Sequence, residues 1–219
     1  MIHLLSPIIF FALFNAPQTV SWDEAKLHTA KNETYLSQIE KEVIYELNKV
    51  RTDPTRYAEE YLTPMTAYYE GKLLKRPQET PLVTQEGVSA LYETIEVLKK
   101  TPASSALKPS KALYRAAASH VAYQMKSGSA SHYGKKDDPQ IRIEKFGEWD
   151  GNIGENLSFG PATARDIVIS LLIDDGVPDR GHRHTILNAD FHYIGTATGP
   201  HPKWGYQCVQ NFATAIKEK

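Results

Sequence analysis

The chain has 219 residues, of which 41% are hydrophobic and 23% are charged, and these values are typical of a globular protein rather than a disordered one. The length suits one domain of ordinary size. With 25 Lys and Arg residues against 26 Asp and Glu residues, the net charge is −1. This balance lacks the basic excess of nucleic-acid-binding domains, so we expect no nucleic-acid partner.

Residues 1–21 have the pattern of a secretory signal peptide. Residues 4–14 are largely apolar, and this stretch is too short to span a membrane as a helix. Small side chains at residues 19–21 offer a cleavage site. The alternative is a buried apolar segment of the mature fold, because no Lys or Arg precedes Lys26. We expect a secreted protein, extracellular or periplasmic, with no stable membrane span.

A single cysteine, Cys208, excludes an intrachain disulfide. A secreted protein of this size without disulfides fits a bacterial exporter better than a eukaryotic secretory pathway. Cys208 lies in an alternating segment typical of a strand, which favours a small core residue over a nucleophile.

Helical spacing of apolar residues begins after a polar stretch, residues 22–31, that we expect to be a linker. Asn32 is the expected N-cap of the first helix, which should end near Arg51. Asp53-Pro54 then begins a shorter helix, and residues 64–84 are expected to form a loop. Four further helices are expected near residues 88–98, 110–127, 139–146 and 163–172.

Alternation replaces helical spacing near the C-terminus. Residues 193–198 and 204–213 alternate between apolar and polar side chains, and residues 199–203 between them are expected to be a hairpin loop. Glu155 is expected in a turn beside Gly154. Helices first and antiparallel strands last indicate an α+β sandwich.

Three segments between residues 131 and 183 place histidines and carboxylates beside glycines. Two are Ser131-His132-Tyr133-Gly134 and Gly154-Glu155-Asn156-Leu157, and the third runs from Asp175 to Arg183. Together they can place two imidazoles and two carboxylates around one cleft, an arrangement suited to acid–base chemistry, a divalent cation or a polar ligand. A carboxylate pair, Asp174 and Asp175, ends a helix, where the dipole disfavours anions, so it needs a cation or a histidine as partner.

In this order, the segments are similar to the signatures of the CAP superfamily, the cysteine-rich secretory, antigen 5 and pathogenesis-related 1 proteins with SCP domains. The matching stretches are residues 131–134, 154–157, 181–188 and 191–195, with a weaker match at residues 47–51. The lack of disulfides resembles the bacterial members. The resemblance implies a three-layer α-β-α sandwich with a mainly antiparallel sheet, an extracellular location and a single domain over residues 32–219.

The resemblance also implies a central cleft with a tetrad of two histidines and two acids. By motif, the histidines are His132 and His182, and one acid is Glu155. The other acid lies on the helix before His182, where the family normally has glutamate and this chain has Asp174 or Asp175. We favour Asp174.

Two departures from the family bear on the cleft. The second acid is shorter than glutamate by a methylene, which changes its reach. Residues 53–109 form an extra helical segment that the compact family domain lacks, and this insertion could cover or reshape the cleft.

Three functions follow from these residues, and we favour the first, a binding module for a divalent cation and a lipid, peptide or glycan. Its ligand-binding set is His132, Glu155, Asp174, Asp175 and His182, in which His132 and His182, with Glu155, offer the nitrogen and oxygen atoms that suit Zn²⁺. The second is an extracellular hydrolase with His132, Glu155 and His182 as catalytic candidates, in which a histidine polarised by Glu155 activates water or a hydroxyl such as that of Ser131. The third is a structural hydrogen-bond network, with function in the insertion.

Overall fold

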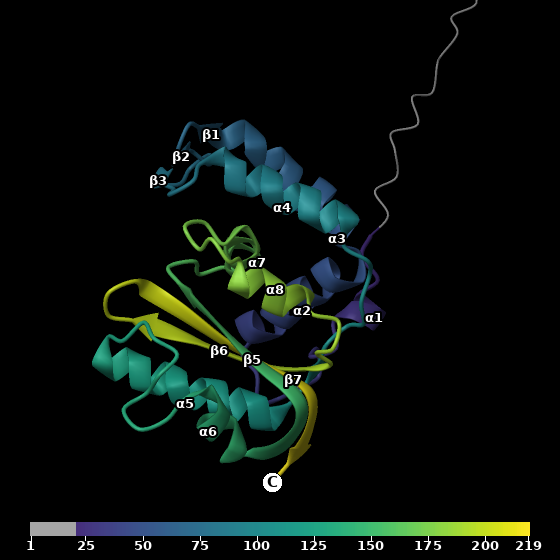
Figure 1. Cartoon of the computed structure of the whole chain (residues 1–219), viewed down its shortest axis with the longest axis vertical. Helices are drawn as coiled ribbons and strands as arrows, with labels where there is room; N and C mark the ends of the chain where they lie inside the picture. Colours follow the sequence, from purple (N-terminus) through teal and green to yellow (C-terminus); the bar gives the residue numbers. More distant parts are fainter. Residues whose placement is uncertain (1–20) are drawn as a thin grey trace, which may run out of the picture.

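The computed structural model describes residues 21–219, so nearly all of the expected signal peptide lies outside the described residues. The described chain forms three main layers (Figure 1). A four-stranded sheet with strand order β4-β6-β7-β5 lies in the middle. Helices α5 and α6 cover one face of the sheet, and α2, α7 and α8 cover the other. The α+β class and the α-β-α sandwich expected from the sequence are confirmed.

The sheet combines three long strands with a short one, namely β4 (Lys108–Pro109), β5 (Gly147–Phe159), β6 (Tyr193–His201) and β7 (Gly205–Glu218). β7 pairs antiparallel with β5 and β6, and β4 pairs parallel with β6. The expected turn at Glu155 is wrong, because this residue lies within β5 opposite Asn211. The preceding residue, Gly154, has little room for a side chain, since a Cβ there would lie 3.1 Å from side-chain atoms of Thr185 and Phe191.

The helices on one face carry the main core, and they are α2 (Gln38–Thr52), α7 (Ala164–Ile173) and α8 (Gly181–Leu187). α2 begins later than the cap expected at Asn32. Ser37 precedes it, and the Glu40 carboxylate accepts the Ser37 backbone N–H at 2.7 Å. α7 begins as expected, because the Thr163 side chain accepts the backbone N–H of Asp166.

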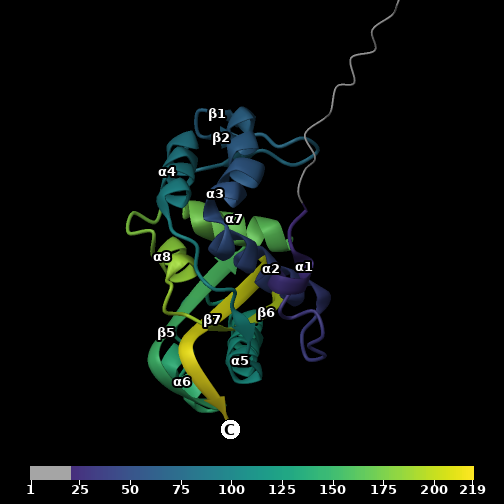
Figure 2. The ribbon, with the colours of Figure 1, turned by 90° about the vertical axis from the view of Figure 1, so that its right-hand side faces the viewer.

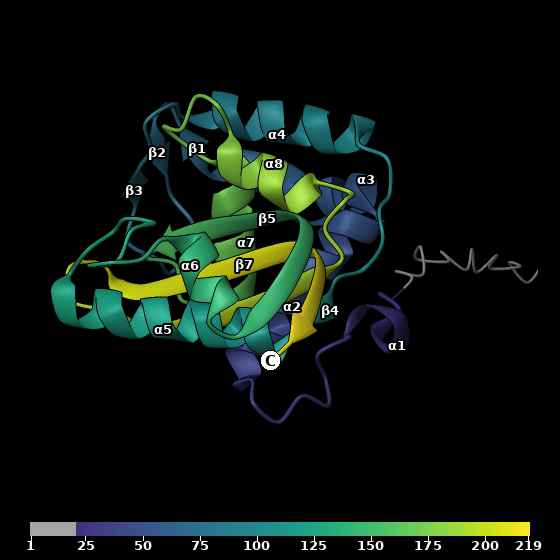
Figure 3. The same ribbon diagram turned by 60° about the horizontal axis from the view of Figure 1, so that its bottom comes forward.

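The other face is covered by α5 (Lys111–Ser127) and α6 (Pro139–Glu144), which lie along the sheet in Figure 3. Both begin where expected, since Ser110 and Asp138 accept backbone N–H groups of their helices. Gly195 lets α5 approach β6, because a Cβ there would lie 2.0 Å from the Tyr114 nitrogen. Among the described residues, no helix is long and apolar enough to cross a membrane.

Most of residues 53–109 form an additional layer beyond α7 and α8 (Figure 2), whereas β4 at the end of this range belongs to the central sheet. The expected loop at residues 64–84 is wrong, because this stretch contains a 3₁₀ helix and a small antiparallel sheet. Its strands have two residues each, too few for alternation to be recognised in the sequence. The elements are α3 (Pro54–Tyr57), a π-helix η1 (Ala58–Leu62), a 3₁₀ helix η2 (Thr63–Tyr68), β1 (Tyr69–Glu70), β2 (Leu73–Leu74), β3 (Leu82–Val83) and α4 (Val88–Lys100).

Residues 22–31, expected to be a linker, pack on the domain. They contain the short helix α1 (Glu24–Leu27), and Leu27 and Ala30 are buried. The Asn48 side chain donates to the Leu27 carbonyl at 2.8 Å. This segment therefore contributes to the core as well as leading into α2.

Candidate functional site

Asp174 and His182 form a hydrogen-bonded pair where α7 ends. Asp174 Oδ1 lies 2.6 Å from His182 Nδ1, and Asp174 Oδ2 accepts the His182 backbone N–H at 3.0 Å. Asp174 ends the helix in the left-handed conformation, with φ 54° and ψ 42°, which aspartate adopts more readily than most residues. The carboxylate is buried at the unfavourable end of the helix dipole, so it depends on these two donors.

Glu155 is paired with both His132 and Arg142. Glu155 Oε1 lies 2.9 Å from His132 Nδ1, and its two oxygens accept from Arg142 Nη2 at 3.0 and 2.7 Å. Arg142 also donates to the His132 carbonyl at 2.9 Å. The side chains of Glu155 and Arg142 are almost fully buried, whereas that of His132 is 44% exposed. Arg142 therefore balances a buried carboxylate, a role that the sequence did not reveal.

The two histidine–acid pairs are held by different layers of the sandwich. Glu155 and Asn156 are consecutive residues of β5, so their side chains point to opposite faces. Glu155 meets Arg142 of α6, whereas Asn156 donates to the His182 carbonyl of α8 at 3.2 Å. The four side chains expected around one cleft form two imidazole–carboxylate pairs.

The arrangement meets only part of what a zinc site needs. In each pair a carboxylate holds Nδ1 and leaves Nε2 to bind other groups, as is usual for a metal-bound histidine. However, residues 21–219 contain no group of three or more His, Cys, Asp or Glu side chains arranged to hold an ion, and a zinc site normally has at least three protein ligands. As placed here, His132, His182 and Glu155 do not form such a site.

Asp175, the other candidate for the second acid, contacts the insertion instead of a histidine. Its two carboxylate oxygens accept the backbone N–H groups of Gln85 and Glu86 at 2.6 and 2.8 Å. These residues lie just before α4, so Asp175 ties the start of that helix to the end of α7.

A network of ion pairs, here called the Arg180 network, joins α8 to the insertion through Arg180, Arg183, Glu86 and Glu93. Arg180 contacts Glu86 at 2.6 and 2.7 Å and Glu93 at 2.8 Å, and Arg183 contacts Glu93 at 2.7 Å. Hydrogen bonds from Arg180 lower the pKa of both glutamates to about 2. Sequence reasoning missed the network because its arginines and glutamates are about 90 residues apart in the chain, and no local pattern links them.

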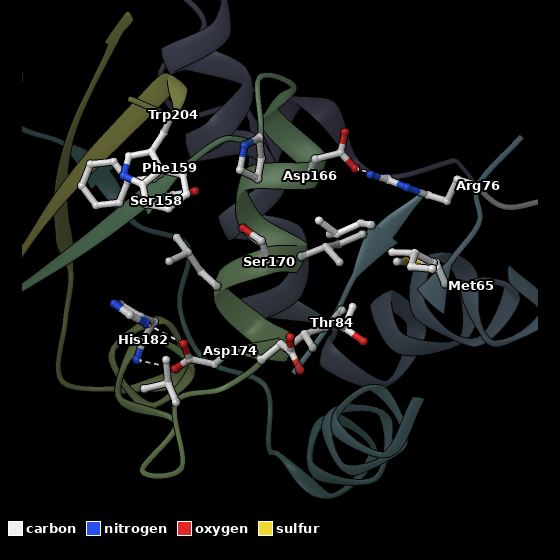
Figure 4. Close-up of a pocket in the computed structure, with 18 of the residues that line it drawn as sticks. Met65, Arg76, Thr84, Ser158, Phe159, Asp166, Ser170, Asp174, His182 and Trp204 are labelled. Carbon is white, nitrogen blue, oxygen red and sulfur yellow. Dashed lines mark hydrogen bonds and ion pairs between the residues drawn. The ribbon is translucent and has the colours of Figure 1, made fainter. Parts of the chain in front are cut away.

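A cavity of about 590 Å³, here called the α7 cavity, lies between α7 and the insertion, and Asp174 and His182 form part of its wall (Figure 4). His182 and Trp204 lie toward one side of the view, and Met65 and Arg76 toward the other. Most of the lining is apolar and includes Met65, Leu74 and Leu82 of the insertion and Leu157, Phe159, Ile169 and Ile173 of the sandwich. His132 and Glu155 are not among the residues that line this cavity.

Two side chains considered as nucleophiles are engaged elsewhere. Ser131 Oγ accepts the backbone N–H of Tyr133 at 3.2 Å. Cys208 is buried, with its Sγ 3.2 Å from Thr196 Oγ1, and burial raises the pKa of its thiol to about 12. The core position expected for Cys208 is confirmed.

Comparison with known proteins places these observations in a family. Residues 44–212 match the model of the CAP family, described as the cysteine-rich secretory protein family. Among solved structures, the chain is similar to an outer surface protein from Borrelia burgdorferi, with 20% identity, 52% of this chain and 78% of that chain covered, and a TM-score of 0.41. A comparison with curated proteins found no match. The family match spans most of the chain and its ordered motifs, and the chain therefore belongs to the cysteine-rich secretory protein (CAP) family.

Proposed function

We propose that this protein is a secreted binding module whose α7 cavity takes an amphipathic small molecule, a lipid with a polar head and a long apolar part. One observation carries the proposal: a mostly apolar cavity of about 590 Å³ has the Asp174–His182 pair in its wall. Ligand sites typically measure about 300–1,000 Å³ and combine an apolar lining with a few placed polar groups. Secretion is part of the proposal, supported by the family's description and by the signal-peptide pattern of residues 1–21.

His182 is the polar group best placed to orient the ligand. Because a carboxylate accepts but does not donate, the bond to Asp174 places a proton on His182 Nδ1. In the neutral imidazole, Nε2 then carries a lone pair and accepts a hydrogen bond. Asp174 holds this ring orientation, so His182 suits a ligand hydroxyl at the cavity wall.

The apolar lining favours a lipid over a glycan or a polar peptide. Burying hydroxyl or amide groups without hydrogen-bond partners costs about 1–3 kcal/mol per group by protein mutational data. The side chains of Met65, Leu74 and Ile169 offer no such partners, whereas a hydrocarbon chain gains about 0.8 kcal/mol per buried CH₂.

Hydrolysis at His182 is the second candidate, because a carboxylate on Nδ1 is how general-base histidines are commonly oriented. Ser170, which lines the same cavity, donates its hydroxyl to the Ile167 carbonyl at 2.9 Å. This hydroxyl is therefore bonded within its own helix, and the geometry supports binding more strongly than nucleophilic catalysis.

Titration with 1-dodecanol, followed by tryptophan fluorescence, tests the binding function. Trp204 lines the cavity, so we expect a saturable fluorescence change that is lost in Trp204→Phe. Ser170 also lines the cavity (Figure 4), and Ser170→Phe should fill it and abolish binding. The matched control is Ser127→Phe at the end of α5, which should bind as the unchanged protein does.

His182→Ala should weaken dodecanol binding about tenfold, the equivalent of one good hydrogen bond. Equal affinity for dodecanol in the Ser170→Phe and Ser127→Phe variants would refute the cavity as the lipid site. Saturable binding of maltose in place of dodecanol would replace the lipid with a glycan. Release of dodecanol from its acetate ester, lost in His182→Ala, would establish the hydrolase instead.

A further inference from the structure

A second cavity, of about 300 Å³, lies on the other face of the sheet between α5 and α6. We call it the α5–α6 cavity. Its lining comes from α5, from the loop before α6, and from α6 and the residue after it. From α5 come Ser119, His120 and Tyr123, from the loop Lys135, Lys136 and Asp137, and from the α6 region Arg142 and Lys145. None of these residues lines the α7 cavity, so the two cavities can be tested separately.

The charges around the α5–α6 cavity are mostly positive. Three lysines and Arg142 line it, against the single carboxylate of Asp137. Asp137 accepts from Arg142 at 3.2 Å and from Lys145 at 2.9 Å. Within residues 21–219, Lys135 and Lys136 have no ion-pair partner and both are exposed. The cavity therefore has an unbalanced positive rim that attracts anions.

Two buried nitrogens in the wall lack hydrogen-bond partners among the described residues. His120 is fully buried, and its Nε2 lies 2.9 Å from the Ser131 carbonyl, while its Nδ1 has no partner. Arg142 is 1% exposed, and its Nε has no partner, although its terminal nitrogens are all engaged in one or more bonds. Such groups are rare in proteins, because a buried polar group left without a partner destabilises the fold.

These two nitrogens have opposite hydrogen-bonding roles. Since a carbonyl accepts, His120 Nε2 must carry the proton toward Ser131. Burial and the nearby Arg142 lower the pKa of His120, so the ring is neutral at pH 7 and its Nδ1 is an acceptor. Arg142 Nε always carries a proton and donates. A group that both accepts and donates, such as water or a phosphate that carries a P–O–H, satisfies both, and the positive rim favours the anion.

We propose that the α5–α6 cavity binds a phosphate group that carries a P–O–H, as in inorganic hydrogen phosphate or a phosphate monoester. Its oxygens would accept from Lys135 and Lys136, and its hydroxyl would donate to Asp137, with the buried Arg142 Nε and His120 Nδ1 lying behind these groups. The volume of about 300 Å³ is at the lower end for small-molecule sites, as such a group requires. Sulfate has no proton to donate at neutral pH and should bind less well.

Calorimetric titration of the full chain with inorganic phosphate tests this proposal, with sulfate titrated at the same pH and ionic strength. We expect saturable phosphate binding, with sulfate about tenfold weaker, as one hydrogen bond would give. Lys135→Met/Lys136→Met should weaken phosphate binding at least about tenfold. The control is Lys111→Met/Lys126→Met, which removes the same charge from exposed positions on α5 and should change the Kd by less than about twofold.

Equal loss of affinity in the two double variants would overturn the proposal, because it would reduce binding to general charge attraction. Equal affinity for phosphate and sulfate would overturn the assignment of a hydroxyl-bearing ligand, and the absence of saturable phosphate binding would refute the site itself. All four substituted lysines are exposed, so the variants should fold, which their thermal melting checks.

Two further titrations identify the source of the phosphate group. Glycerol 3-phosphate that binds and is displaced by inorganic phosphate would indicate a soluble monoester. Sedimentation with phosphatidylcholine vesicles that contain phosphatidic acid, lost in Lys135→Met/Lys136→Met and kept in the control, would indicate a lipid headgroup. Binding of inorganic phosphate alone would identify the free ion as the ligand.

Discussion

Arg180 donates two hydrogen bonds to the Glu86 carboxylate, at 2.6 and 2.7 Å, and so joins α8 to the insertion beside the α7 cavity. Arg180 is itself in the left-handed conformation, with φ 51°, and its Nη1 also donates to the Asp174 carbonyl at 2.9 Å. Arg180, which positions the insertion, is thus bonded directly to Asp174, which orients His182. The insertion and the candidate site should therefore respond together when this contact is lost.

Arg180→Met is expected to loosen the insertion while the sandwich stays folded. The substitution keeps a long side chain but removes the arginine partner of Glu86 and leaves Glu93 with Arg183 alone. We expect a fall in Tm on the order of 5 °C and faster proteolysis within residues 71–87, measured by limited digestion and mass spectrometry. Arg115→Met, at an exposed arginine of α5 that stacks on Phe146, is the control. Digestion at the same rate in both variants would contradict this role.

The Arg180 network should weaken under acidic conditions. Hydrogen bonds from Arg180 lower the pKa of Glu86 and Glu93 from 4.5 to about 2. A carboxyl whose pKa is lower in the folded state contributes stability above its unfolded pKa and loses that contribution as the pH falls through the folded value. Glu86→Gln/Glu93→Gln should therefore melt below the unchanged protein at pH 5 and 7, and the gap should close between pH 4.5 and 2. A difference in Tm between the double variant and the unchanged protein that stays constant with pH would contradict this role of the Arg180 network.

The two histidine–acid pairs should contribute to stability independently. Because no hydrogen bond joins the two pairs within residues 21–219, the effects of His132→Ala and His182→Ala on the free energy of unfolding should add to within about 0.5 kcal/mol. His182→Ala should cost more, about 1–3 kcal/mol, since it leaves the buried Asp174 carboxylate short of a donor. Urea unfolding of the two single variants and the double variant measures this, and a coupling above about 1 kcal/mol would place the pairs in one network.

Zinc binding, one of the options that the sequence left open, is tested by the same variants. The described residues gather no three ligands, so we predict that the two histidines do not share one ion. Calorimetric titration with zinc should give at most weak binding. Any heat of zinc binding that is lost in His182→Ala should still be observed in His132→Ala. Tight binding of one zinc ion, abolished equally by either single variant, would show that the two pairs come together around the metal.

Local signals in the sequence predicted most helices, and tertiary contacts decided the rest. Ser110, Asp138 and Thr163 were recognisable caps because a capping side chain acts on its own helix. β5 was missed because three glycines interrupt its alternation, although pairing along the whole of β7 holds it in the sheet. A strand that depends on its neighbour carries little signal of its own.

The sequence indicated most of the residues of the candidate site but not how they are arranged in space. The motifs named each histidine and Glu155, and the position of Asp174 at the end of α7 predicted a cation or a histidine as its partner, which is His182. No sequence pattern indicated that Arg142 would be buried against Glu155, because charged residues are normally exposed. The contact of Glu155 with α6 and of Asn156 with α8 depends on the direction of two consecutive side chains, which requires that the strand be recognised first.

Cys208 offers a test of how firmly the sheet is held. Burial raises the pKa of its thiol to about 12, so at pH 8 only about one thiol in ten thousand is ionised, and the thiolate is the reactive form. We expect no measurable reaction with a disulfide reagent such as dithionitrobenzoate in the native protein, and complete reaction in denaturing urea. Because β7 lies between β5 and β6, labelling requires that the sheet open, and its rate should follow global unfolding. Rapid labelling of the native protein would show that the sheet opens locally.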